Sequence, residues 1–189
     1  MTRRGGIFLA IFMFAALGFV ATQPKAQSGL HYQDWYHASF GALAEDLTDA
    51  TAAGKRLAVV WEQIGCAPCA QMHEVNFQDP KVVEFIKKNF LVVQFDFRGN
   101  RMVTDFDGQV MSEKELARKH RVTTTPFIQF FPENAEALKG KRGTEAEVAR
   151  MPGLFKPDTF LALFQYVHER RYEKEDFTSY LRARNKSAS

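Results

Sequence analysis

Cys66 and Cys69 are the only cysteines of the 189-residue chain. The run before them, residues 57–61, is short, apolar and rich in strand-forming residues. The run after them, residues 70–75, contains helix formers and no glycine or proline. At a strand-to-helix turn the first thiol lies at a helix N-terminus, where unpaired N–H groups and the helix dipole favour the thiolate. This spacing predicts thiol–disulfide exchange, with Cys66 attacking and Cys69 resolving the mixed disulfide.

A structural disulfide is the alternative interpretation, because exported proteins commonly carry such bonds. A bond between Cys66 and Cys69 closes a very short loop, however, and removes little entropy from the unfolded chain. We therefore interpret the pair as a redox centre rather than as a stabilising cross-link.

The first residues are typical of an export signal. Arg3 and Arg4 precede an apolar stretch from Ile7 to Val20, and small residues follow, with cleavage expected near Ala21 or Ala26. The apolar stretch is shorter than the ~20 residues that cross a bilayer comfortably. We expect residues 1–26 to be a signal peptide and the mature protein to be periplasmic; an uncleaved membrane anchor is the alternative.

The distribution of charge argues against a nucleic-acid partner. Of 25 Lys and Arg residues, Arg3, Arg4 and Lys25 precede residue 27, which leaves 22 basic residues against 22 acidic ones. The basic character of the chain therefore belongs to its leader, and the rest has no excess of positive charge for a nucleic acid.

The remaining residues are enough for one domain. We predict a lead-in segment over residues 27–37 that packs back on the body, a domain over 38–183 and a polar tail over 184–189. Helical spacing from Phe40 to Ala50 predicts a helix before the first strand.

Local signals place the other elements. Asp79-Pro80 begins a helix, Asp107-Gly108 turns a hairpin, and Ser112 with Glu115 forms a capping box. Residues 91–97 and 127–131 are strands, and we expect residues 136–143 to return as a partner strand. Two helices near residues 160–167 and 177–181 follow. The predicted order is helix, strand, helix, helix, strand, helix, strand, strand, helix, helix, which indicates an α/β domain with a mixed central sheet flanked by helices.

The cysteine turn and Thr125-Pro126 at the head of a later strand together resemble the thioredoxin superfamily. The resemblance implies a thioredoxin-like fold with extra C-terminal helices and a cis bond before Pro126, next to the cysteines. It also implies that Gly65, Thr125 and Pro126 contact the substrate, which pairs with a backbone edge there. An ordinary proline at a strand start is the alternative for Pro126.

A narrower resemblance covers residues 38–183. Four short sequence segments are similar to those of exported thioredoxin-like proteins of bacterial sulfur-oxidation systems (SoxW type). They are Glu62–Cys66, Met72–Phe77, Asp79-Pro80 and Pro152–Phe155. That subgroup often has proline and an aromatic residue between its cysteines, whereas this chain has Ala67 and Pro68.

A second departure concerns the buried aspartate of cytoplasmic thioredoxins, whose position is Val60 here. Glu62 lies two residues further and so points to the same face of a strand. We expect Glu62 to serve as proton acceptor for Cys69; a solvated carboxylate at a strand end is the alternative.

No cofactor or metal is expected. His73 lies four residues after Cys69, and the other histidines are scattered, so a closed zinc site lacks ligands. Haem attachment fails because Ala70, not histidine, follows Cys69. We expect His73 at the helix surface, as a polar residue or a mild electrostatic neighbour of the thiols.

The expected partners are protein thiols and disulfides of the cell envelope, together with an upstream membrane electron donor. Two alternatives stay open. One is a reductant for cytochrome c maturation or for envelope disulfides in general. The other is a thioredoxin-fold binding module whose cysteines sense redox state without catalysis.

Overall fold

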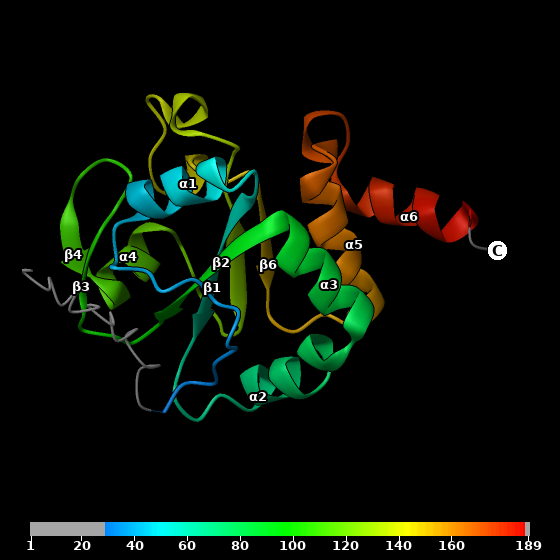
Figure 1. The fold of residues 1–189 in the computed structure, drawn as a ribbon, viewed down its shortest axis with the longest axis horizontal. Helices are drawn as coiled ribbons and strands as arrows, with labels where there is room; N and C mark the ends of the chain where they lie inside the picture. Colours follow the sequence, from blue (N-terminus) through cyan, green and yellow to red (C-terminus); the bar gives the residue numbers. More distant parts are fainter. Residues whose placement is uncertain (1–28, 188–189) are drawn as a thin grey trace, which may run out of the picture.

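The computed structural model describes residues 29–187 and contains a mixed four-stranded sheet in the order β2-β1-β5-β6 (Figure 1). β1 pairs with β2 in parallel and with β5 antiparallel, and β5 pairs antiparallel with β6. The four strands are β1 (Arg56–Glu62), β2 (Phe90–Asp96), β5 (Phe127–Phe130) and β6 (Ala149–Pro152).

Helices cover both faces of the sheet, as the alternation along β1 requires. Ala58 and Val60 face one core, built with α2 (Ala67–Glu74), α3 (Pro80–Asn89) and α5 (Pro157–His168). Val59 and Trp61 face the other core, built with α1 (Leu43–Ala52) and α4 (Glu113–Lys119). Because every residue of β1 is buried, this strand is the centre of the domain and holds the turn that follows it in a fixed place.

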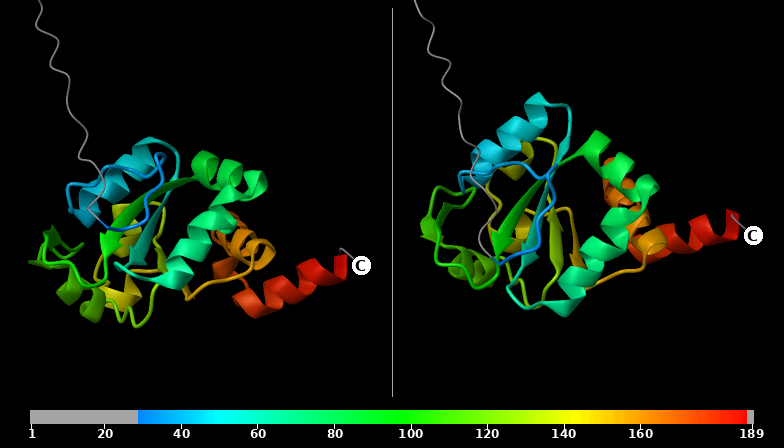
Figure 2. Two further views of the ribbon diagram at one scale, coloured as in Figure 1. Left: turned by 90° about the horizontal axis from the view of Figure 1, so that it is seen from below. Right: turned by 60° about the horizontal axis from the view of Figure 1, so that its bottom comes forward.

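The C-terminal extension is helical, as predicted. After α5 the chain forms a 3₁₀ turn and then α6 (Phe177–Ser187), which extends away from the body (Figure 2). Its first turns are attached through the rings of Phe177 and Tyr180, whose centroids both lie 5.4 Å from that of Tyr166 on α5.

The local signals of the sequence are confirmed. β3 (Met102–Thr104) and β4 (Val110–Ser112) form an antiparallel hairpin around Gly108. Ser112 and Glu115 form the capping box of α4, and the Asp79 side chain accepts a hydrogen bond from the Lys81 N–H at the start of α3.

The prediction of a strand over residues 136–143 is wrong. That segment contains the 3₁₀ turns Ala135–Leu138 and Gly143–Glu145, and the partner of β5 is β6, further along the chain. The segment has no alternation of apolar and polar residues, so it cannot bury one face as a sheet strand does. The first helix also begins later than predicted, at Leu43, and Phe40 is 87% exposed.

Residues 29–37, which we call the N-terminal strap, pack on the body as expected. Trp35 and Tyr36 make edge-to-face contacts with Phe77 after α2, with ring centroids 5.3 and 6.1 Å away. The predicted signal peptide, residues 1–26, lies outside the described residues. Within residues 29–187 no helix has the length and apolar character needed to cross a membrane.

Candidate active site

The two cysteines lie at the end of β1 and the start of α2. Cys66 is the N-cap residue of α2, and its Sγ accepts a hydrogen bond from the Cys69 N–H at 3.1 Å. Gly65 precedes it with φ of +75°, a left-handed conformation that favours glycine and turns the chain from strand to helix. Cys66 and Cys69 are joined by a disulfide, and both sulfurs lie where the helix N-terminus stabilises negative charge.

The two cysteines differ in their access to solvent. Cys66 is 5% exposed and lines a surface groove, whereas Cys69 is completely buried in the core. When the disulfide is reduced, a large partner can therefore reach only Cys66. This is the asymmetry that an attacking and a resolving thiol require.

The Thr125-Pro126 segment lies beside Cys66, as the resemblance implied. The bond between the two residues is cis, and the Thr125 hydroxyl donates to Cys66 Sγ at 3.4 Å. The Pro126 carbonyl accepts a hydrogen bond from the Gly153 N–H at 2.9 Å, which fixes this loop against the chain after β6. The structure thus brings Gly65, Cys66 and Thr125 to one groove.

The groove continues past the cysteine turn to the loop after β2. Among the described residues of its lining, Arg98 carries the only charge, and its Nε donates to Gln63 Oε1 at 3.0 Å. The lining is therefore polar and without carboxylates, which suits an uncharged backbone better than a basic ligand. It consists of Gln63, Gly65, Cys66, Ala67, Pro68, Phe97, Arg98, Thr123, Thr124 and Thr125.

Glu62 is completely buried, so the alternative of a solvated carboxylate is wrong. Its Oε1 lies 2.8 Å from His73 Nε2, and its Oε2 is buried without a hydrogen-bond partner in the described part of the chain. Burying a carboxylate oxygen without a hydrogen-bond partner costs free energy. A native protein that contains such a group usually has a structural or functional use for it.

His73 is buried as well, which corrects the expectation that it lies at the helix surface. The reason is the N-terminal strap, which covers this side of α2: Gln33 Nε2 lies 2.9 Å from His73 Nδ1, and the His31 ring lies 5.3 Å from the His73 ring. The sequence signal for this burial was weak, because strap and helix are far apart in the chain.

Tyr36 of the strap completes the surroundings of Glu62. Burial, reinforced by the negative charge of Glu62 and by Tyr32, raises the pKa of Tyr36 well above its usual value. Its hydroxyl is buried and has no hydrogen-bond partner among residues 29–187. Tyr36 therefore stays protonated near Glu62 at any physiological pH.

Within the described residues no three His, Cys, Asp or Glu side chains gather closely enough to bind a metal ion.

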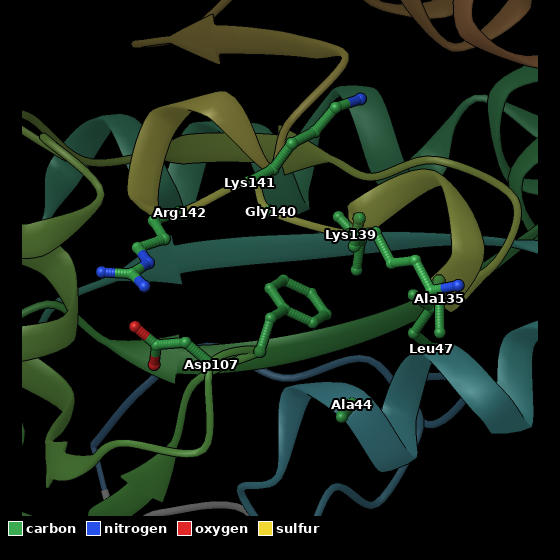
Figure 3. A pocket seen from close by; sticks show the side chains of 10 residues that line it. Ala44, Leu47, Asp107, Ala135, Lys139, Gly140, Lys141 and Arg142 are labelled. Atoms are coloured by element: carbon green, nitrogen blue, oxygen red, sulfur yellow. The ribbon is translucent and has the colours of Figure 1, made fainter.

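A separate pocket lies between α1 and the 3₁₀ turn at Ala135–Leu138, where Arg142 and Asp107 point toward one another (Figure 3). It shares no residue with the groove beside Cys66.

The comparisons with known proteins agree with this architecture. The family model described as a thioredoxin-like domain matches residues 43–168, and the chain belongs to this family. Its match includes the cysteine turn, Thr125-Pro126 and the whole central sheet.

Solved structures with the same architecture include a thioredoxin-fold protein from Helicobacter pylori, with a TM-score of 0.53 at 19% identity over 70% of this chain and 86% of that one. A thioredoxin from Thermus thermophilus matches with a TM-score of 0.48 at 28% identity, over 65% of this chain and 81% of that one. No curated protein matches the sequence.

Proposed function

We propose that this protein is an exported thiol–disulfide oxidoreductase that exchanges electrons with protein disulfides through Cys66 and Cys69. The observation that carries the proposal is the placement of the pair: Cys66 caps α2 at a groove, and Cys69 is buried behind it. A purely structural disulfide has no need of this asymmetry or of a hydroxyl directed at one sulfur.

The reaction runs in two steps in the reduced protein. The Cys66 thiolate attacks one sulfur of the partner disulfide, which forms a mixed disulfide and releases the other partner sulfur as a thiolate. Cys69 then loses its proton and attacks Cys66 Sγ. The Cys66–Cys69 disulfide forms, and the second partner sulfur leaves as a thiolate that takes a proton from water. Two electrons pass to the partner, and an upstream donor must restore the dithiol.

Glu62 is the proton acceptor for Cys69 in this proposal. Cys69 is completely buried, so its proton needs an internal acceptor or a path to water. Glu62 is a buried carboxylate with one oxygen unpaired, and its other oxygen binds His73, one helical turn beyond Cys69. Residues four apart on a helix share a face, which puts Glu62 on the side of α2 where Cys69 lies.

The partner is an extended protein segment that lies in the groove against Gly65 and Thr125 and pairs with the backbone at Pro126, which follows the groove lining in the chain. The resemblance to SoxW-type proteins favours a partner in bacterial sulfur oxidation, and the leader favours the periplasm. Reduction of cytochrome c maturation proteins or of envelope disulfides in general is the runner-up with the same chemistry. A redox-sensing binding module is the alternative without turnover.

Trapping tests the proposal directly. The Cys69→Ser protein should accumulate partners bound covalently to Cys66, and reducing agent should release them for identification. The Cys66→Ser protein, which keeps the fold but not the attacking sulfur, is the matched control and should trap nothing. If the protein with both cysteines replaced by serine binds its partner as tightly as the native protein, and the native protein shows no disulfide reduction, the chain is a binding module.

The location is tested separately. N-terminal sequencing of the periplasmic fraction should find a protein that begins at about residues 22–28. Recovery of a protein that retains Met1 in the membrane fraction would support the anchored alternative instead.

A further inference from the structure

Three side chains from three elements contact one another in series behind the cysteines. Gln33 comes from the N-terminal strap, His73 from α2 and Glu62 from β1. Gln33 Nε2 lies 2.9 Å from His73 Nδ1, and His73 Nε2 lies 2.8 Å from Glu62 Oε1. Of the three, Glu62 is completely buried and His73 is 6% exposed, so water does not screen the inner contact.

The outer contact determines which nitrogen of His73 carries the proton. The Gln33 amide nitrogen is only a donor, so Nδ1 must be the acceptor and cannot itself carry hydrogen. The proton of the neutral ring is then on Nε2, where it is donated to Glu62 Oε1. A carboxylate that receives this hydrogen bond is stabilised in its charged form.

The inner contact leaves one carboxylate oxygen available. Glu62 Oε2 is buried and has no partner among residues 29–187, while Oε1 is held by His73. His73 lies one turn after Cys69 on the same face of α2, and side chains so spaced are about 5–6 Å apart at their Cβ atoms. The contact with His73 therefore keeps Glu62 on the Cys69 side of the helix.

We propose that Gln33 is a positioning residue for the resolving step: it fixes the tautomer of His73, and His73 holds Glu62 Oε1, which leaves Oε2 free to accept the Cys69 proton. This inference rests on the proposed oxidoreductase function. It assigns to the N-terminal strap a part in the chemistry of the cysteine pair.

Other ionisable groups surround this series. The His31 ring and the Tyr36 ring of the strap lie 5.3 and 6.1 Å from the His73 ring. Asp96 on β2 pairs in register with Glu62, and Glu74 lines the same surface pocket as Gln33 and His73. A change of Gln33 leaves all four of these groups in place, so its effect on pH dependence reports on the series itself.

The step is balanced without a further reactant. Cys69 gives its proton to Glu62 Oε2 and attacks Cys66 Sγ, and the bond from Cys66 to the partner sulfur breaks. The partner leaves as a thiolate and is protonated by water, and Glu62 returns its proton to solvent before the next cycle.

An aromatic disulfide reagent separates the two steps. The attack of Cys66 on such a reagent releases one coloured thiolate and leaves a mixed disulfide on Cys66. The attack of Cys69 on that mixed disulfide releases the second coloured thiolate. Stopped-flow absorbance from about pH 6 to about pH 9 gives the rate of each phase. The variants are Gln33→Met, which cannot donate, and Gln33→Glu, which accepts from Nδ1 and so reverses the tautomer preference.

Gln94→Met is the matched control. The Gln94 side chain also binds the strap, since its Nε2 donates to the His31 carbonyl at 2.5 Å, but it does not contact His73. We expect both Gln33 variants to slow the second phase near neutral pH. In Gln33→Glu the slowing should be about tenfold, which is a part of the ~10²–10⁴-fold that a general base contributes. In these variants the rate of the second phase should also rise more steeply with pH, while the rate of the first phase stays unchanged. In the Gln94→Met protein both rates should stay as in the native protein.

Two results would overturn the inference. One is a second phase with the native rate and pH profile in both Gln33 variants. The other is equal slowing in Gln33→Met and Gln94→Met, which would make the strap a mere cover. Absence of the first phase in the native protein is a different result, because it would refute the oxidoreductase function itself.

The ¹⁵N shifts of the His73 ring give a readout independent of activity: Nδ1 should be unprotonated in the native protein and protonated in Gln33→Glu.

Discussion

The Thr125 hydroxyl points at the sulfur of Cys66, with 3.4 Å between Oγ1 and Sγ, although the two residues are 59 positions apart in the chain. The contact joins the loop before β5 to the N-terminus of α2. In the reduced protein the hydroxyl is placed to donate to the thiolate, and hydrogen bonding to the charged form lowers the pKa of a thiol.

Thr125→Val should therefore raise the pKa of Cys66 and slow its alkylation near neutral pH. The shape of the side chain is kept and the donor is lost. We expect a shift of about one pKa unit, which corresponds to ~1.4 kcal/mol. The rate of reaction with iodoacetamide as a function of pH measures it. Thr123→Val is the control, since Thr123 lines the same groove and has no hydrogen bond to either sulfur. Equal shifts in the two variants would contradict a specific role for Thr125.

The two thiols should react very differently with small reagents. Cys66 lies at the groove and Cys69 is fully buried, so Cys69→Ser should keep fast alkylation and Cys66→Ser should lose it by at least about tenfold. Mass spectrometry of the reduced, alkylated proteins gives the site and the rate. Faster labelling of Cys69 would reverse the assignment of attacking and resolving thiol.

Local signals in the sequence predicted those parts of the fold whose determinants lie within a few residues. The cysteine turn, the Asp79 cap, the hairpin at Gly108 and the capping box at Ser112 are of this kind. Each depends on hydrogen bonds between neighbours in the chain, so the residue types alone specify it.

Features that depend on distant segments were missed. β6 has no alternating pattern of its own and is a strand because it pairs with β5, with the Gly153 N–H bound to the Pro126 carbonyl. His73 is buried because the N-terminal strap packs over it, with Gln33, 40 residues earlier in the chain, in contact with its ring. A helix-surface position was the reasonable expectation for a polar side chain on this helix, and tertiary packing overrode it.

Asp46 on α1 should make the protein less stable as the pH rises. Burial raises its pKa to about 6, although hydrogen bonding from Ser39 and the charge of His37 act in the opposite direction. The unfolded value is 3.8, so between about pH 4 and about pH 6 the folded state binds the proton that the unfolded state has lost. Stability that is present below the lower value is therefore lost as the pH passes through the higher one.

Asp46→Asn isolates this contribution, because the amide can still accept from the Ser39 hydroxyl. The free energy of unfolding of the native protein, relative to that of the variant, should fall by up to about 3 kcal/mol from about pH 4 to about pH 7. Urea denaturation at several pH values measures the difference. A difference that does not change with pH would show that Asp46 titrates normally in the folded protein.

Gly99 should be among the least replaceable glycines of the described chain, because of a buried carboxylate rather than a turn. A Cβ at this position would lie 1.9 Å from Glu113 Oε2. Glu113 cannot retreat freely: it is completely buried, and its Oε1 accepts from both Nε and an Nη of Arg101, at 3.1 and 2.9 Å. Gly99→Ala should thus displace the buried carboxylate from its half-buried cation, at a cost of at most about 3–5 kcal/mol, the cost for a fully buried ion pair.

Gly108→Ala is the control for the loss of glycine alone. Gly108 has a φ of +78° and open space around the new methyl group, so its replacement should cost only the ~1–2 kcal/mol of a left-handed alanine. Urea denaturation should therefore rank Gly99→Ala as the more damaging change. Glu113→Ala combined with Gly99→Ala supplies the decisive comparison: once the carboxylate is gone, the added methyl group should cost much less, because the nearest atom left is then the Asp96 Cβ, 3.0 Å away. If Gly99→Ala is as costly without Glu113 as with it, the clash with the carboxylate is not what excludes a side chain at position 99.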